Sequence, residues 1–268
     1  MAEFSITPLY SGSSGNSTLI KAGRTNILID AGRNCKTLCE ALAAVGTDPQ
    51  SIDALFITHV HSDHIGAVDV FVRKYPTKLI ATRSSHGYFA RKFSKPHPLT
   101  QDFEIASGES MRLAEDLTVS CCRTPHDAAG SVCYRVDYKG TGCAVMTDMG
   151  YVTEDLMKFA LGTRTILLES NYDERMLAYG PYPEDLKIRI AGERGHLSND
   201  DCARMMRYLI ENGTNDFILG HLSENNNTPE KAYKTSVDYL ARYSYVQGKD
   251  YSIKVANRYE PTVPTEIL

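Results

Sequence analysis

Four side chains that commonly bind metal ions stand close together in the segment Thr58-His59-Val60-His61-Ser62-Asp63-His64. His59 and His61 alternate, so in an extended chain they point to the same side. The turn that follows presents Asp63 and His64 from another direction, an arrangement that suits two adjacent ions better than one. Imidazole and carboxylate ligands without thiolates favour zinc, manganese or iron, and they indicate an open catalytic site rather than a closed structural one.

Three further residues of ligand type follow apolar segments that are expected to be strands. His126 stands in Thr-Pro-His-Asp, Asp148 follows residues 144–147, and His221 follows residues 217–220. Loops at the ends of buried strands are where a layered fold gathers its active site. The alternatives are an exposed histidine-rich loop and an isolated structural histidine. Three more ligands placed in this way favour a metal site.

The elements that must position these residues follow from hydrophobic periodicity and turn residues. Strands are expected at residues 4–10, 17–21, 26–30, 53–58, 78–81, 117–123, 131–138, 143–147, 165–169 and 217–220. Helices are expected at 36–45, after His64, from the N-cap Thr153 to about 161, from the capping box of Ser198 and Asp201 to about 209, and from Thr228 toward 243. This order predicts an α/β (layered α+β) fold with two sheets between helical layers, and no linker or repeat divides the chain, so we expect one domain over residues 1–268.

Composition narrows the class of protein. The 268 residues carry 33 acidic and 29 basic side chains, a formal net charge of −4 that does not exclude a local basic groove. No apolar run approaches the roughly 18 residues that span a bilayer, and no basic, then apolar leader opens the chain. We therefore expect a soluble, cytoplasmic protein without a membrane partner. The seven scattered cysteines are interpreted as small apolar fillers.

The order His59-x-His61-x-Asp63-His64, His126, Asp148, His221 resembles the metallo-β-lactamase superfamily over nearly the whole chain. The resemblance implies a four-layer αββα sandwich with two metal ions at the edge of its sheets. It assigns metal one to His59, His61 and His126, and metal two to Asp63, His64 and His221, with Asp148 bridging and Asp30 as a structural hydrogen-bonding residue. Asp63 is also counted as catalytic.

An aspartate at the bridging position is typical of hydrolases that hold two ions. A hydroxide between ions about 3.5–4 Å apart can attack carbonyl carbon or phosphorus, so these ligands do not choose the substrate. The phosphodiesterase branch, including the tRNase Z proteins, adds a Glu–His pair that protonates the departing oxygen, and Glu169 and His196 match its order and spacing. General acid catalysis is worth roughly 10²–10⁴ in rate for such a leaving group. The alternatives are a surface acid at a strand end and a capping or packing histidine.

Within that branch the chain resembles the compact YycJ/WalJ (VicX) group in the phrases at residues 10–17, 169–173, 195–199 and 221–226. This resemblance implies a metal-dependent DNA exonuclease that works from 5′ ends with two divalent ions, Mn²⁺ or Zn²⁺, with iron also compatible. Other functions that remain open are a phosphodiesterase of small nucleotides or RNA ends, a thioester or lactone hydrolase, and a binding module that retains a metal site.

A nucleic-acid substrate, DNA rather than RNA, requires contacts to phosphate groups. The loop with Ser13, Ser14 and Asn16 offers backbone N–H groups to a terminal phosphate. Basic residues precede His196 and are expected to meet phosphates beside it: Lys187, Arg189 and Arg194. The alternative for each of them is an ordinary solvated charge. The sequence does not indicate a protein partner.

Overall fold

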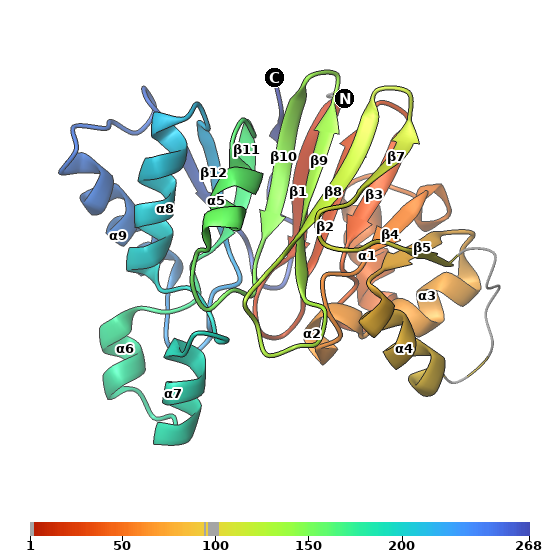
Figure 1. Ribbon diagram of the computed structural model, residues 1–268, viewed down its shortest axis with the longest axis horizontal. Coiled ribbons are helices and arrows are strands. Elements are labelled where there is room, and N and C mark those ends of the chain that lie inside the picture. Colours follow the sequence, from red (N-terminus) through yellow and green to blue (C-terminus); the bar gives the residue numbers. More distant parts are fainter. Residues whose placement is uncertain (1–2, 94, 96–101) are drawn as a thin grey trace.

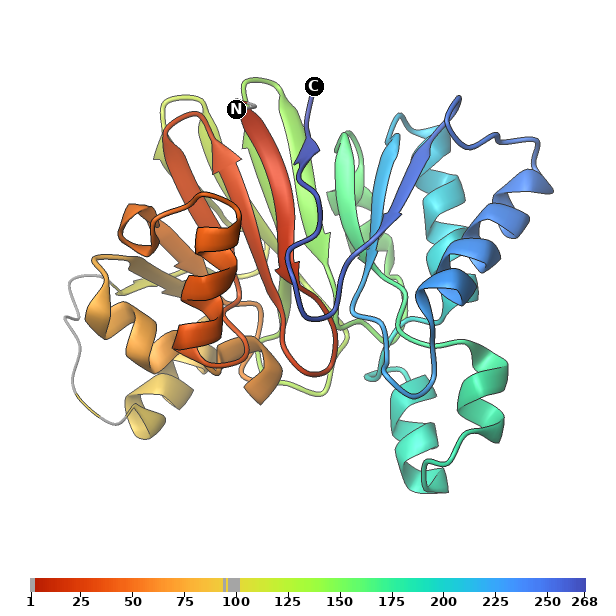
Figure 2. The same ribbon diagram turned by 180° about the vertical axis from the view of Figure 1, so that it is seen from behind.

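The computed structural model describes residues 3–93, 95 and 102–268, and in these residues two sheets pack face to face with helices on both outer sides (Figure 1). The first sheet has the strand order β14–β1–β2–β3–β4–β5–β6. Its strands are β1 Phe4–Tyr10, β2 Ser17–Ala22, β3 Thr25–Ile29, β4 Ala54–Phe56, β5 Lys78–Ala81, β6 Asp102–Glu104 and β14 Thr265–Glu266. Strands β3 to β6 run parallel, whereas β1 pairs antiparallel with both β2 and β14, which brings the two ends of the chain together (Figure 2).

The second sheet has the order β13–β12–β11–β10–β9–β8–β7. Its strands are β7 Ser110–Ala114, β8 Leu117–Arg123, β9 Val132–Tyr138, β10 Thr141–Met146, β11 Thr165–Glu169, β12 Asp216–Gly220 and β13 Ser252–Val255. Strands β10 to β13 run parallel and β7 to β10 antiparallel. Each sheet therefore has a run of parallel strands whose carboxyl ends reach one edge.

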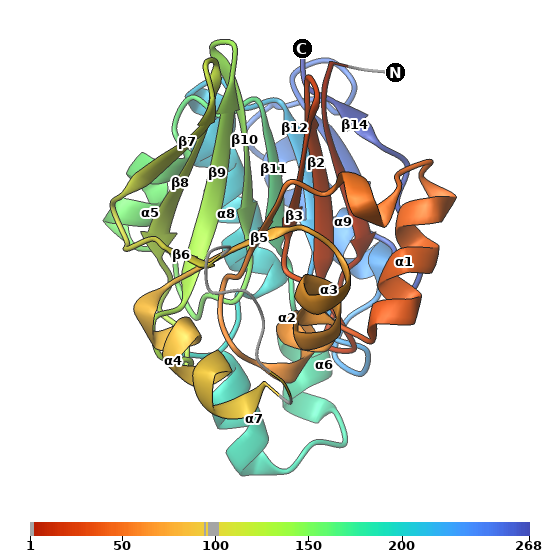
Figure 3. The same ribbon diagram turned by 90° about the vertical axis from the view of Figure 1, so that its right-hand side faces the viewer.

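Helices complete the outer layers. They are α1 Cys35–Ala44, α2 Ser62–Ile65, α3 Val68–Lys74, α4 Arg83–Lys92, α5 Glu154–Ala160, α6 Glu174–Tyr179, α7 Glu184–Ala191, α8 Asn199–Glu211 and α9 Pro229–Ala241, with a 3₁₀ turn at Pro49–Ser51. Helices α1 and α3 cover the first sheet, and α5, α8 and α9 cover the second (Figures 1 and 3). The expected four-layer αββα sandwich is thus confirmed.

Three apolar clusters hold the layers together. One lies between the sheets and contains Phe56, Tyr134 and Ile218, and the other two lie between each sheet and its helices. Burial of one large apolar side chain contributes roughly 1.5–3 kcal/mol, so these clusters supply the main stabilisation of the sandwich. None of the described helices is long and apolar enough to cross a membrane.

The expected N-caps coincide with those in the structure. The side chains of Thr153, Ser198 and Thr228 each accept a hydrogen bond from the backbone N–H three residues later, at the start of α5, α8 and α9. The helix expected after His64 is α3, and a further short helix, α2, begins at Ser62 and contains Asp63 and His64. His61 has an extended backbone at the N-cap position, so the chain turns into the helix one residue after it.

Helices α4, α6 and α7 were not expected from the sequence. Within α7 no residue is buried, and its apolar residues Leu186, Ile188 and Ile190 alternate along the chain, a spacing typical of a strand. Together α6 and α7 project from the edge of the sandwich at which α2 also lies (Figure 3). This edge carries the candidate site.

Candidate metal centre and its acid–base pair

The candidate metal ligands come from both sheets. His59, His61, Asp63 and His64 follow β4 of the first sheet. His126, Asp148 and His221 follow β8, β10 and β12 of the second. Ligands that are far apart in the sequence therefore face one another where the edges of the two sheets meet.

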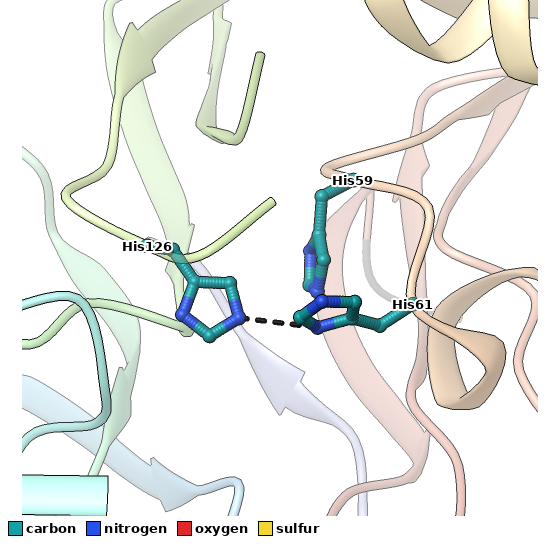
Figure 4. Close-up of side chains that lie close together, drawn as sticks. All are labelled: His59, His61 and His126. Atoms are coloured by element: carbon teal, nitrogen blue, oxygen red, sulfur yellow. Dashed lines mark hydrogen bonds between the residues drawn. The ribbon is translucent and has the colours of Figure 1, made fainter. Parts of the chain in front are cut away.

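Three histidines form a first cluster, His59, His61 and His126, whose ligand atoms all lie within 4.8 Å of one another. Figure 4 shows the His126 ring approaching from the loop after β8, opposite the other two rings. Nδ1 of His61 lies 3.2 Å from Nε2 of His126. Nitrogen atoms that converge in this way match the ligand geometry of a transition-metal ion.

A second cluster consists of Asp63, His64 and His221. Oδ2 of Asp63 lies 3.4 Å from Nε2 of His64 and 3.6 Å from Nε2 of His221. Asp148 stands between the two clusters, because its carboxylate oxygens lie 3.2 Å from Nε2 of His64 and 3.6 Å from Nε2 of His126. The residues that the sequence assigns to two adjacent sites are thus neighbours in space.

Hydrogen bonds at Nδ1 orient the ring of His64, His126 and His221. Their partners are Oδ2 of Asp30 at 2.7 Å, the carbonyl oxygen of Gly195 at 3.0 Å and Oε1 of Glu169 at 2.8 Å. A ring that donates from Nδ1 keeps the lone pair of Nε2 for a metal ion.

The residues present fit bound metal ions. Among the buried polar atoms that lack a hydrogen-bond partner in the described part of the chain are Nε2 of His59, Nε2 of His221 and Oδ2 of Asp148. An unpartnered buried polar atom costs roughly 1–3 kcal/mol, and these three all belong to the expected ligand set. A metal ion is the partner that would satisfy nitrogen lone pairs and a carboxylate oxygen at once.

In the metal-free site, the carboxylates shift the pKa values of the histidines, and the histidines shift those of the carboxylates. Burial disfavours the charged form of His221, but the negative charges of Asp148, Asp63 and Glu169 outweigh it and raise its pKa to about 10. Burial likewise opposes ionisation of Asp148, yet the surrounding histidines hold its pKa well below the usual range. The pKa of His59 lies well below its usual value, because burial dominates there. The metal-free site therefore carries protons that ligation must displace.

Glu169 and His196 form the expected pair in space. Nδ1 of His196 lies 2.8 Å from Oε1 of Glu169 and 3.6 Å from Oδ1 of Asp148. Glu169 is fully buried, and its second oxygen accepts hydrogen bonds from the backbone N–H groups of Met149 and Leu197. Its burial raises the pKa and the neighbouring His196 lowers it, with a net depression that keeps Glu169 a carboxylate.

Three site residues adopt left-handed backbone conformations within two residues of the ends of their strands. The φ angles are 61° for Asp30, 61° for Asp148 and 55° for His221. Such a conformation costs roughly 1–2 kcal/mol for a residue other than glycine. The surrounding hydrogen bonds must therefore hold the chain in a turn that points each side chain into the site.

The loop with Ser13, Ser14 and Asn16 contacts the second cluster. The side-chain amide of Asn16 donates to Oδ2 of Asp63 at 3.2 Å, and the backbone N–H of Asn16 donates to the carbonyl oxygen of Asp63 at 2.7 Å. Asn16 is buried, whereas Ser13 and Ser14 are exposed at the loop tip. The loop thus meets a candidate ligand through Asn16 and presents its serines to solvent.

The three expected phosphate contacts lie in different surroundings. Nζ of Lys187 donates to the carbonyl oxygen of Ala178, and Nε of Arg189 lies 2.6 Å from Oδ2 of Asp127. Arg194 is exposed and lines a groove of about 660 Å³ that includes His126.

Sequence reasoning singled out Arg194 but not three other residues that line this groove. These are Arg123, Asp127 and Tyr151. The one available signal was the position of Asp127 directly after the expected ligand His126.

Comparisons with known proteins agree with this geometry. The model of the Metallo-beta-lactamase superfamily matches residues 10–221. The exodeoxyribonuclease WalJ of Streptococcus pneumoniae is 33% identical over 265 residues, which cover 98% of each chain. The exodeoxyribonuclease YycJ of Bacillus anthracis is 29% identical over 259 residues, covering 97% of this chain and 96% of that one. In structure, the metallo-beta-lactamase fold protein YhfI of Bacillus subtilis matches with a TM-score of 0.73 at 14% identity, over 98% of this chain and 99% of YhfI.

Proposed function

Because the chain belongs to the metallo-β-lactamase superfamily, and is a metal-dependent hydrolase similar to WalJ and YycJ, we propose that it is a DNA exonuclease that removes nucleotides from 5′ ends. Membership in the superfamily implies divalent metal ions, typically two. We assign them to the clusters described above, with Asp148 shared, and we favour Mn²⁺ or Zn²⁺, with iron compatible with the same ligands. When bound, such ions would stabilise charge on phosphoryl oxygens and lower the pKa of water.

The observation that carries the proposal is the position of His196. Its Nδ1 is committed to Glu169, which leaves Nε2 to hold a proton for the substrate. Its side chain is 22% exposed, so the ring borders solvent next to the buried Asp148. A residue placed in this way can protonate the 3′ oxygen that leaves when a phosphodiester breaks.

Glu169, the other member of the pair, fixes the position from which His196 delivers this proton. Glu169 accepts from Nδ1 of both His196 and His221, so one carboxylate orients the acid and a metal ligand together. The backbone N–H of Met149 donates to Oε2 at 2.9 Å and limits rotation of the carboxylate. Such fixed geometry lowers the cost of reaching the transition state.

A second candidate function is hydrolysis of a small phosphodiester. The groove beside His126, of about 660 Å³, lies in the size range of small-ligand pockets. Arg123 and Arg194 in its walls would meet the phosphate, and Tyr151 would offer a ring for stacking.

The test uses linear duplex DNA labelled separately at its 5′ and 3′ ends. The protein is stripped of metal, reloaded with Mn²⁺ or Zn²⁺, and compared with Asp148→Ala. We expect the 5′ label to appear at once as mononucleotide, the 3′-labelled strand to shorten stepwise, and both to persist in the variant. His86, which contacts the carbonyl oxygen of Phe103 outside the clusters, serves as the matched control in His86→Ala.

Two other outcomes would redirect the assignment. Immediate release of the 3′ label as mononucleotide, with stepwise shortening of the 5′-labelled strand, would reverse the direction of digestion. Intact DNA under both metals, with cleavage of a cyclic or dinucleotide phosphodiester, would favour the second candidate.

A further inference from the structure

His61 differs from the other histidines that have been assigned to the metal. Its Nδ1, not its Nε2, faces the first cluster, at 3.2 Å from Nε2 of His126. Its side chain is 33% exposed, whereas those of His64 and His221 are buried. The orientation of this ring therefore depends on a partner near the surface rather than on the packed interior.

Asp127 lies where that partner is needed. Its Oδ1 lies 3.3 Å from Nε2 of His61 and 3.5 Å from Nε2 of His126, so this oxygen stands beside two rings of the first cluster. Its Oδ2 is 2.6 Å from Nε of Arg189, so the other oxygen is held from helix α7.

Arg189 belongs to the projecting helix α7. Within α7 no residue is buried, and Lys187 ties it to α6 through the carbonyl oxygen of Ala178. The side chain of Arg189 is 59% exposed, and an exposed ion pair contributes little to stability. Its contact with Asp127 is therefore better explained by the geometry that it imposes than by stabilisation of the fold.

We propose that Asp127 is a positioning residue for the metal ligand His61, and that Arg189 holds Asp127 in place, so that α7 is coupled to the first metal site. An acceptor at Nε2 fixes the tautomer in which Nδ1 has a free lone pair. It also raises the basicity of that nitrogen, as partners of metal-bound histidines do. The inference rests on the metal centre of the proposed function and not on its DNA substrate.

The test measures metal affinity directly. The metal-free full-length protein is titrated with Zn²⁺ in competition with a chromogenic chelator, for the wild type, Asp127→Ala, Asp127→Asn, Arg189→Gln and the double variant Asp127→Ala/Arg189→Gln. The Asp127→Ala variant should bind one of the two ions about 10–100-fold more weakly than the wild type and the other with unchanged affinity. Asp127→Asn keeps an acceptor oxygen and should lose less.

Arg189→Gln should lower the affinity for the same ion by a smaller factor. The double variant should have the same affinity as Asp127→Ala, because Arg189 acts through Asp127. The matched control is Arg207→Gln, which removes an arginine whose Nε lies 2.9 Å from Oε1 of Glu211 on α8. It should bind both ions as the wild type does. With Co²⁺ in place of Zn²⁺, the visible absorption of the weakened site should change in Asp127→Ala and not in Arg207→Gln.

Unchanged metal affinity in Asp127→Ala would overturn the inference, as would effects of the two single variants that simply add. Thermal unfolding of each metal-free variant identifies a folding defect, and if Asp127→Ala does not fold, the comparison of Arg189→Gln with Arg207→Gln decides alone. Failure of the wild type to digest DNA, together with weakened metal binding in Asp127→Ala, would refute the nuclease and leave the positioning role intact.

Discussion

Nδ1 of His64 and Oδ2 of Asp30 lie 2.7 Å apart at the buried floor of the candidate metal centre. The same carboxylate accepts hydrogen bonds from the backbone N–H and the hydroxyl of Thr58, both at 2.8 Å. Asp30 follows β3 and Thr58 follows β4, so one side chain joins two strand ends and orients a ligand at the same time.

This relationship predicts that Asp30→Asn weakens metal binding and the fold together. The amide keeps the size of the side chain and tolerates the left-handed backbone, but it replaces one acceptor oxygen with a donor. We expect the affinity for one ion to fall about 10–100-fold and the free energy of unfolding to fall by about 1–3 kcal/mol. Chelator competition and urea unfolding of the metal-free protein measure the two effects. The exposed Asp53 provides the control Asp53→Asn, which should change neither by much.

The acid–base pair predicts different outcomes for its two members. His196→Ala should retain both ions while kcat for DNA falls roughly 10²–10⁴-fold, because the departing oxygen loses its proton donor. Glu169→Gln should lower kcat and also metal affinity, since Glu169 orients His221 as well. Steady-state rates with elemental analysis of bound metal separate the two. A fully active His196→Ala enzyme would remove His196 from the chemistry.

Two glycines predict opposite effects of the same substitution. A Cβ on Gly32 would stand 1.9 Å from the carbonyl oxygen of Asp63 and 2.6 Å from the backbone nitrogen of Asn16. These backbone atoms cannot move aside without shifting Asp63. Gly32→Ala should therefore lower the free energy of unfolding by about 1–3 kcal/mol and abolish binding of one ion. Gly87→Ala, in α4, meets only the end of the Arg91 side chain at 3.7 Å and should stabilise by about 0.5–1 kcal/mol. Equal destabilisation in both variants would contradict this reading of the turn.

Metal binding should release protons. With a pKa raised to about 10, His221 is protonated in the metal-free protein at pH 7, and it must lose that proton to bind a metal ion. The apparent affinity should therefore rise with pH, by about tenfold per unit for each proton displaced, until the pH passes that pKa. Calorimetric titration with Zn²⁺ in two buffers of different ionisation enthalpy counts the protons. A count of zero would show that His221 is neutral or is not a ligand.

Local patterns predicted much of the fold. The N-caps Thr153, Ser198 and Thr228 could be recognised because each depends on a side chain and a backbone group three residues apart. The strand ends that carry Asp148 and His221 could be located because apolar runs stop there. Helix α7 could not, since its apolar residues Leu186, Ile188 and Ile190 alternate as in a strand and none of them is buried.

The site was less accessible to the sequence than the fold. Clustering indicated the ligands that follow β4, but the family resemblance was needed to join Glu169 with His196, 27 residues apart. The contact of Asp127 with Arg189 spans 62 residues, and no periodicity encodes it. The loop with Asn16 could be located, yet the direction of its amide is fixed by hydrogen bonds to Gly12 and Asp63, the second of them 47 residues away, which only the three-dimensional structure shows.

The division of the candidate ligands between the two sheets has a consequence for the order of events in biosynthesis. The segment with His59 to His64 is made early, whereas Asp148 and His221 emerge from the ribosome only after most of the second sheet. A nascent chain that has made only β1 to β6 carries half of each candidate ligand set, and we expect it not to retain an ion. If the two clusters bind ions as proposed, metal loading is expected to be a late event that reports docking of the two halves, and an incomplete chain should remain without metal.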